Sequence, residues 1–371
     1  MKRLVLLGGG HAHVGVLAAL AEQPLDGWAV ELVTPYRRQI YSGMLPGWVA
    51  GHYTVDACAI ALDSLAARVG VGFHHTFAVG LDLARNTVHG ADGEALHFDA
   101  LSIDTGPVAD LSRLPGSAEH ALSVRPIERF IAAWPELVAR IAGQRGRFDL
   151  AVVGAGAAGV ELAFAIQHRA AIEGWSHLFV NLVGSDDLPL AGTPAATRRH
   201  AARLLKQRGI AWLGPRRASH LDAGLVHFAA GLPLAFDGCL VSIGAAAPAW
   251  PAAAGLATDD PGFIRVGPTL QSLSHPHVFA AGDVAAYASA RPKSGVYAVR
   301  AGPVLAHNLR AYCMAGELQL WTPQSRALYL ISTGDRYALA TWGAWSWSGR
   351  WVWHWKDHID RQFMRRYGTS A

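Results

Sequence analysis

The sequence has few cysteines, no long apolar run and no long run of one charge. Its three cysteines, Cys58, Cys239 and Cys313, are widely spaced and include no C-x-x-C pair, so a redox-active disulfide and a cysteine-bound metal are both disfavoured. The opening apolar run, Leu4 to Leu7, breaks into glycines too early for a signal peptide. No stretch reaches the roughly 18 apolar residues of a spanning helix. We therefore expect a cytoplasmic protein.

The overall charge also excludes one class of partner. The net charge is +4 and the pI is near 9.1, but no nucleic-acid motif accompanies this basicity, so we expect no nucleic-acid partner. The chain has 371 residues, of which 51% are hydrophobic and 16% charged. This composition predicts a well-buried globular protein with more than one domain.

Two glycine loops stand about 150 residues apart. In the first, the apolar run leads into Gly8-Gly9-Gly10-His11-Ala12-His13. In the second, Leu150 to Val153 leads into a complete G-x-G-x-x-G pattern formed by Gly154, Gly156 and Gly159. Each loop lies between a strand pattern and a helix pattern, where open backbone and a helix N-terminus can hold a pyrophosphate. The loops predict two bound dinucleotides, although tight turns with close helix packing would also explain the second pattern.

A third segment, Pro276 to Asp283, is a short apolar strand that ends in Gly282-Asp283. The carboxylate can accept hydrogen bonds from ribitol hydroxyls, while the glycine leaves room for a cofactor. Asp283 also suits a helix N-cap before Val284, and the two roles are compatible. The strand from Ala100 to Asp104 is followed by Thr105-Gly106, which we expect near the same cofactor.

These segments predict an α/β fold with two Rossmann-like domains, the second inserted in the first, and a small C-terminal α+β segment. We expect the strand from Leu240 to Ile243 and the turn at Ala245 to Pro248 to cross back into the first domain. The expected parts are an FAD-binding domain over 1–113 and 240–312, an NAD(P)-binding-like domain over 114–239, and a tryptophan-rich interface segment over 313–371.

Together the three segments resemble the pyridine nucleotide-disulfide oxidoreductase superfamily of two-dinucleotide-binding flavoproteins. A narrower resemblance rests on Tyr41 to Gly47, Gly334 to Ala338 and Gly349 to Trp353, taken with the first glycine loop. The whole chain is similar to the flavoprotein module found alone or fused to selenide, water dikinase. That module is similar to type II NADH dehydrogenases and sulfide:quinone reductases.

The resemblance implies FAD as cofactor and NAD(P)H as co-substrate. Gly8, Gly10 and the helix start at His11 and Ala12 would hold the FAD pyrophosphate. Pro46 would lie near the isoalloxazine ring. Lys293, with the helix start at Gly295, would face the pyrimidine edge of the flavin and stabilise its anionic reduced form.

The sequence departs from the family pattern at the ribose-binding positions. His13 stands where the third glycine is usual, and Thr34-Pro35 replaces the expected acid, which leaves Glu31 as a poor substitute. The strand over 178–183 ends in Gly184-Ser185, so Asp186 or Asp187 would have to serve NADH. For His11 and His13, a loop that faces a pyrophosphate explains their position better than a metal site, and we expect no metal.

Glu161 follows the second loop at a position where type II NADH dehydrogenases carry a glutamate beside the flavin and the acceptor. Buried there, it would have a raised pKa and could take or pass a proton. An acid favoured by the helix macrodipole is an equally good explanation.

Six of the thirteen tryptophans lie near the C-terminus: Trp342, Trp345, Trp347, Trp351, Trp353 and Trp355. From Arg350 onward, Trp351, Trp355, Ile359 and Phe363 recur every four residues, which predicts one helical stripe. Residues 350–371 carry five Lys and Arg against two Asp. This pattern is typical of a helix in a lipid interface, here at the inner face of the cytoplasmic membrane through 343–371. A helix packed on the protein's own core or on a second subunit of a homodimer is the alternative.

The sequence therefore predicts an FAD-dependent NAD(P)H oxidoreductase that reduces a second acceptor, for which a quinone is the best candidate. Lys293 and Glu161 are the expected catalytic residues. A flavin-holding partner or sensor protein of the selenium pathway, with little NAD(P)H turnover, is the alternative.

Overall fold

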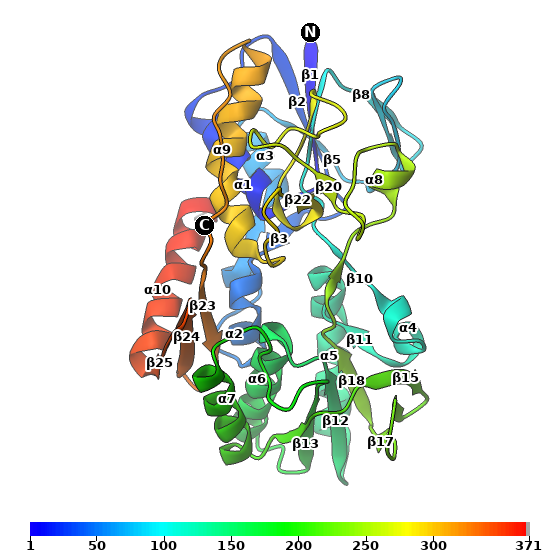
Figure 1. Ribbon diagram of the computed structural model, residues 1–371, viewed down its shortest axis with the longest axis vertical. Helices are drawn as coiled ribbons and strands as arrows, with labels where there is room; N and C mark the ends of the chain where they lie inside the picture. Colours follow the sequence, from blue (N-terminus) through cyan, green and yellow to red (C-terminus); the bar gives the residue numbers. More distant parts are fainter. Residues whose placement is uncertain (369–371) are drawn as a thin grey trace.

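The computed structural model describes residues 1–368. The chain forms two bodies, each built around a five-stranded parallel sheet, one above the other along the long axis of the molecule (Figure 1). The inner strands of both sheets are short, mostly apolar runs that are largely buried on both faces, as parallel sheets covered by helices require. The predicted α/β class is confirmed.

The first sheet has the strand order β21-β9-β1-β2-β5. Helix α1 crosses from β1 to β2 and packs against α9, where Gly15 faces Gly302 closely enough that an added Cβ would lie 3.4 Å from its Cα atom. The elements of this body are β1 (Lys2–Leu7), α1 (His11–Glu22), β2 (Trp28–Val33), α3 (Leu62–Arg68), β5 (Gly72–His74), β9 (Ala100–Ile103), β21 (Val278–Ala280) and α9 (Gly295–Cys313).

The second sheet has the order β11-β18-β12-β13-β14. Its β12 and β13 pair from Phe148↔Leu178 to Val153↔Val183, just as β1 and β2 pair from Lys2↔Trp28 to Leu7↔Val33. Both glycine loops therefore begin at the carboxyl edge of a central strand. The elements are β11 (Leu122–Ser123), α5 (Ile127–Gly143), β12 (Phe148–Val153), α6 (Ala157–Glu173), β13 (Leu178–Val183), α7 (Ala195–Gln207), β14 (Ala211–Leu213) and β18 (Gly238–Val241).

The chain leaves the first sheet after β9 and returns to it with β21, and all of the second sheet lies between them in sequence. The return differs from the prediction in one detail. Leu240 and Val241 belong to β18, which pairs with β11 and β12 inside the second sheet. The crossing comes later, where β19 (Ala245–Ala246) pairs antiparallel with β10 (Val108–Ala109).

Small sheets and short helices complete the two bodies. The first body carries the pair β3 (Arg38–Ile40) and β4 (Ala59–Ala61), the sheet β6 (Ala78–Asp82), β7 (Thr87–Gly90) and β8 (Ala95–His97), and the pair β20 (Ile264–Arg265) and β22 (Ala285–Ala286). The second carries β15 (Ala218–Asp222), β16 (Leu225–Phe228) and β17 (Leu234–Ala235). The short helices are η1 (Ser42–Met44), α2 (Leu45–Val49), η2 (Asp56–Cys58), η3 (Leu111–Arg113), α4 (Ser117–His120), α8 (Trp250–Ala253) and η4 (Gly282–Val284).

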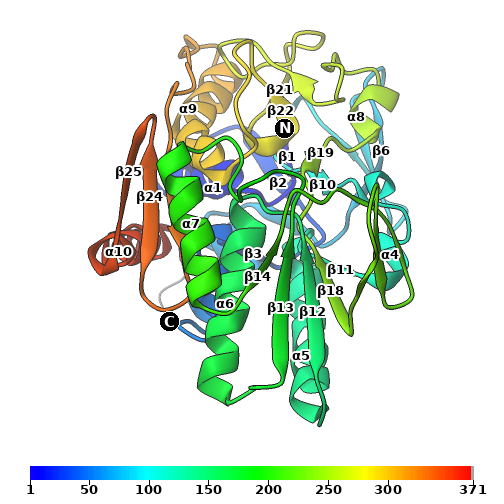
Figure 2. The same cartoon turned by 60° about the horizontal axis from the view of Figure 1, so that its bottom comes forward.

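The C-terminal segment is a three-stranded antiparallel sheet, β23 (Leu328–Ser332), β24 (Ala338–Trp342) and β25 (Trp345–Gly349), followed by α10 (Arg350–Tyr367). Figure 2 shows α10 beside β24 and β25. Of the predicted stripe, Trp351 and Trp355 are exposed, as a lipid-facing helix requires, whereas Phe363 at its end is buried. The buried face is formed by Val352, Trp353, Lys356, Asp360, Phe363 and Tyr367.

The helix thus packs on its own protein and keeps tryptophans in solvent. Residues 369–371, the end of the predicted interface segment, lie outside the described residues. Within residues 1–368, every helix is too short or too polar to cross a bilayer.

Candidate functional site

The first glycine loop is tightly built into the sheet. Gly8 has φ +96°, its amide donates to Val33 O, and an added Cβ would lie 2.5 Å from Asp104 O, so only glycine fits there. His13, at the third glycine position, is fully buried and joins Gly8 O through Nδ1 at 2.6 Å and Ser102 Oγ through Nε2 at 2.8 Å. Burial lowers the pKa of His13 to about 4. His13 is therefore neutral, and its hydrogen bonds join the loop to β9.

Asp104 is a residue whose role the sequence analysis missed. It follows β9, and its Oδ2 accepts the amides of Ala12 at 2.8 Å and His13 at 3.1 Å. These are amides of the first turn of α1, which the family pattern assigns to a pyrophosphate. Burial, together with a smaller effect of nearby Asp283, raises the pKa of Asp104 to about 7, while the hydrogen bonds from the amides of His13 and Ala12 oppose the rise. The only sequence signal was an acid at the end of a buried strand.

The structure brings the Gly282-Asp283 segment to the same place. Gly282 has φ +71°, and an added Cβ would lie 2.5 Å from Asp104 Oδ1. The Asp283 side chain is 11% exposed and lies 3.9 Å from Arg125. Burial raises the pKa of Asp283, while Arg125 and Lys293 oppose that shift. Beyond Asp104, Thr105 is exposed and Gly106 has φ +71°.

Lys293 lies beside this segment, immediately before α9. Its Nζ donates to Ala285 O at 2.7 Å and lies 3.6 Å from the centroid of the Phe263 ring. Burial lowers the pKa of Lys293, and Asp283 opposes the shift. Helix α9 begins at Gly295, where an added Cβ would lie 3.6 Å from Ser42 Oγ. The loop that precedes Pro46 therefore adjoins the start of α9.

Glu161 lies in a buried polar cluster between α6 and α10. Its Oε1 accepts the amide of Ser332 at 2.8 Å. Burial raises the pKa of Glu161 to about 7, and the Lys356 ammonium opposes this rise. Lys356 itself donates to Asp360 at 2.6 Å and to Gly43 O at 2.5 Å.

The sequence analysis missed Lys356 and Asp360. Their i, i+4 spacing gave no sign that both would be buried. Pro46, also buried, lies in α2, which packs on α6. The segment around Pro46 and the acid on α6 are therefore neighbours.

The second glycine loop differs from the first in exposure. Gly154 has φ +111°, and its amide donates to Val183 O. An added Cβ on Gly159 would overlap Gly154 O, so the helix start needs that glycine. Gly156 to Ala158 are exposed, and no side chain of residues 1–368 caps this turn. The first turn of α6 therefore faces solvent.

The positions at which ribose binding was expected lie at the ends of β2 and β13. Glu31 is directed toward His74, 3.0 Å away, within the first sheet. Thr34, at the end of β2, is buried. In the second body, an added Cβ on Gly184 would overlap the Trp212 indole, so an acid cannot stand there without displacing that ring. Asp186 is half exposed and lies 3.9 Å from Arg198.

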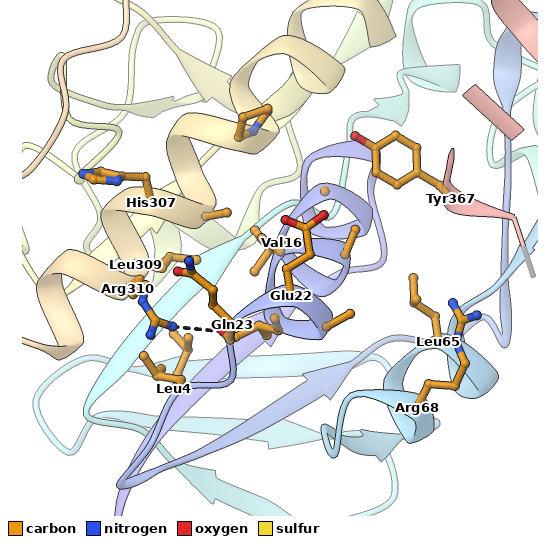
Figure 3. Close-up of a pocket in the computed structure, with 18 of the residues that line it drawn as sticks. Leu4, Val16, Glu22, Gln23, Leu65, Arg68, His307, Leu309, Arg310 and Tyr367 are labelled. Carbon is orange, nitrogen blue, oxygen red and sulfur yellow. Dashed lines mark hydrogen bonds between the residues drawn. The ribbon is translucent and has the colours of Figure 1, made fainter. Parts of the chain in front are cut away.

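A cavity of about 520 Å³ lies between the later part of α1 and α9 (Figure 3). Its lining includes Val16, Leu65, His307, Arg310 and Tyr367. None of the predicted site residues lines it.

Two curated proteins are similar in sequence. NADH dehydrogenase-like protein YutJ of Bacillus subtilis is 22% identical over 232 residues, which cover 61% of this chain and 61% of YutJ. Demethylphylloquinone reductase NdbB of a Synechocystis species is 26% identical over 215 residues, which cover 56% of this chain and 52% of NdbB. The match thus spans less than two thirds of either relative.

Solved structures share the fold over nearly the whole chain. The sulfide:quinone oxidoreductase of Aquifex aeolicus has a TM-score of 0.83 at 17% identity, covering 99% of this chain and 91% of its own. The NDH2 of Plasmodium falciparum, solved with NADH, has a TM-score of 0.81 at 11% identity, covering 100% and 99%. The family described as pyridine nucleotide-disulphide oxidoreductase matches residues 2–302. Because that match extends over most of the sequence, the chain belongs to the pyridine nucleotide-disulphide oxidoreductase family.

Proposed function

We propose that this protein is an FAD-dependent oxidoreductase that passes a hydride from NAD(P)H to the flavin and then electrons to a quinone. FAD and NAD(P)H are the cofactor and co-substrate of the family. The names of two relatives, an NADH dehydrogenase-like protein and a demethylphylloquinone reductase, support the donor and the acceptor class. The association with selenide, water dikinase remains a prediction from resemblance.

The observation that carries this proposal is the contrast between the two glycine loops. Gly8 and Gly9 are buried and joined to the sheet, whereas Gly156 to Ala158 are exposed. A resident cofactor suits an enclosed loop, and a co-substrate that must enter and leave at each turnover suits an open one. We therefore assign FAD to the first loop and NAD(P)H to Gly154, Gly156 and Gly159.

The first loop also has a feature that fits FAD. The Nε2 atom of His11 is buried and has no hydrogen-bond partner within residues 1–368, which is costly unless a ligand completes it. Burial lowers the pKa of His11 to about 4, so the ring is neutral. We assign the FAD diphosphate to Gly8, Gly10 and His11, with Ala12 shared with Asp104, and the ribitol to Asp283.

The remaining FAD contacts are proposed from proximity to this loop. Thr105, Gly106 and Gly282 would border the cofactor, and Pro46 would lie beside the flavin ring. Lys293, with Gly295, would place positive charge at the pyrimidine edge.

Glu161 supplies the proton chemistry in this proposal. When bound, FAD accepts a hydride and passes electrons on one or two at a time. A carboxyl group with a pKa of about 7 holds or releases a proton near neutral pH. Lys356 is the neighbouring charge that would stabilise the ionised form of Glu161 after the proton has left.

Sulfide as electron donor is disfavoured by the cysteines. Burial raises the pKa of Cys58, Cys239 and Cys313 to about 12 in each case, so none is a ready thiolate. All three are free thiols.

We further propose peripheral attachment to the membrane through the C-terminal segment. Trp342, Trp345, Trp347, Trp351 and Trp355 are between 38% and 62% exposed. Trp342 pairs with Trp345, and Trp347 with Ala340, so these side chains share the sheet face on which α10 packs through Ala340 and Val352. Exposed indoles with nearby arginines suit a lipid interface.

The test of the redox proposal is anaerobic addition of NADH or NADPH to the holoprotein. We expect bleaching of the flavin band, followed by reoxidation when a soluble quinone is added. An oxidised flavin that persists in both nucleotides would overturn the donor assignment, and reduced flavin that ignores quinone would overturn the acceptor.

A further inference from the structure

The hairpin formed by β15 and β16 carries two histidines and an aspartate on one face. His220 pairs directly with His227 across the hairpin, and Asp222 lies two residues from His220 on the same strand. Because side chains alternate along a strand, these three share one face. Leu221 and Val226 lie on the other face, buried.

The three side chains bring ligand atoms together. One nitrogen of each histidine and one carboxylate oxygen of Asp222 all lie within 4.8 Å of one another. Asp222 Oδ2 is 2.8 Å from His227 Nε2 and 4.0 Å from His220 Nε2. Bonds of about 2.1 Å to a tetrahedral ion place its ligand atoms roughly 3.4 Å apart. The observed separations lie on both sides of that value.

The contacts of the His220 and His227 rings favour metal binding over a simple ion pair with Asp222. His227 Nε2 is buried and has no hydrogen-bond partner within residues 1–368, although the Asp222 oxygen is so near. The Asp222 oxygen therefore lies off the direction in which the ring nitrogen forms hydrogen bonds. This geometry is expected where the nitrogen and the oxygen both point toward a metal ion. His220 Nδ1 lies 3.2 Å from Ser219 Oγ, a partner of the kind that leaves Nε2 free to bind a metal.

We propose that the β15–β16 hairpin binds a divalent ion of the Zn²⁺ class through His220, Asp222 and His227. Two imidazoles and one carboxylate suit zinc and leave a fourth position for water. The two rings now stack in parallel, with centroids 4.2 Å apart and planes at 5°. Ion binding requires the His220 ring to turn out of this stack, and its side chain, 46% exposed, has room to do so.

Metal binding at this hairpin would stabilise the second body and would not change the flavin site in the first body. The buried face of the hairpin packs with Val153 and Val241, at the carboxyl ends of β12 and β18. An ion that clamps β15 to β16 would hold that packing in place, and we expect it to raise the thermal midpoint. The hairpin lies beside α4, low in Figure 1.

The test is isothermal titration calorimetry, in which ZnCl2 is added to the full-length, tag-free holoprotein after a chelator has removed any bound metal. The variants are His227→Asn and Asp222→Asn at the hairpin, and Ser219→Ala, for which we expect about tenfold weaker binding. The control is His89→Ala, an exposed histidine on β7 of a different hairpin.

We expect wild type and His89→Ala to share one saturable site that His227→Asn and Asp222→Asn lose. We also expect ZnCl2 to raise the thermal midpoint of wild type and His89→Ala but not that of His227→Asn or Asp222→Asn. Equal zinc stoichiometry and affinity in wild type and His227→Asn, or no saturable site in wild type, would overturn the proposal. Flavin absorbance and circular dichroism, measured without zinc, show whether each variant is folded. If His227→Asn does not fold, Asp222→Asn provides the same test with both histidine rings retained.

Discussion

Replacement of Asp104 by asparagine tests the buried carboxylate at the first loop. Asparagine keeps an oxygen that can accept the amides of Ala12 and His13 and removes the charge. Burial raises the pKa of Asp104 from 3.8 to about 7. Each pH unit corresponds to about 1.36 kcal/mol, so ionising this group in the folded protein costs at most about 4 kcal/mol.

The sign of the pH effect follows from proton binding. Between pH 4 and pH 7 the folded protein holds a proton on Asp104 that the unfolded chain has released. The free energy of unfolding contributed by this group therefore falls as the pH rises through that range, and the full cost applies above pH 7. We expect Asp104→Asn to be more stable than wild type at pH 8 and nearly equal to it at pH 4.

FAD affinity should follow the same trend, because an ionised Asp104 repels the diphosphate at the amides they share. The assays are urea unfolding and FAD fluorescence titration at pH 5.5 and pH 8, with Asp260→Asn, an exposed aspartate, as the matched control. The variant should bind FAD more tightly than wild type at pH 8, with a smaller difference at pH 5.5. If wild type and Asp104→Asn show the same pH dependence in both assays, Asp104 is not the titrating group and the reasoning fails.

Four other variants test the remaining assignments. Glu161→Gln should slow quinone reduction by about 100-fold and remove its pH dependence near pH 7, with flavin reduction by NADH unchanged in stopped flow. Lys293→Met should lower the flavin midpoint potential, measured by dye equilibration; an unchanged potential contradicts the charge role. Gly159→Ala, whose methyl group would overlap Gly154 O, should weaken NADH binding in titrations while FAD stays bound. Trp351→Ala with Trp355→Ala should reduce sedimentation with anionic liposomes, and equal sedimentation contradicts the membrane proposal.

Point substitutions test the membrane proposal better than truncation. Phe363 and Tyr367 of α10 belong to the core of the first body, and Phe363 stacks on Tyr41 with centroids 4.3 Å apart. Removal of 343–371 would expose that core, so lost liposome binding could not be separated from misfolding. Among the described residues, the rings of Trp351 and Trp355 stack only on each other, with centroids 6.3 Å apart.

The two units of strand, glycine loop and helix could be predicted from local sequence alone. In each unit the apolar strand, the turn and the helix are adjacent in the chain, so local backbone geometry decides them. Gly8 and Gly154 both adopt positive φ, a backbone conformation that glycine takes readily in the tight turn between a strand and a helix. The same locality explains why the fold class could be predicted and why Gly282-Asp283 was recognised.

The residues that surround those loops could be identified only from the tertiary structure. Asp104 reaches the amides of α1 from more than 90 positions away, and Lys356 comes to Glu161 from the last helix of the chain. Likewise, the period of four in α10 placed Trp351, Trp355 and Phe363 on one stripe, but packing on the first body buried Phe363 and left Trp351 and Trp355 exposed. Such contacts depend on strand order and on which helix face is covered, and no local pattern encodes either.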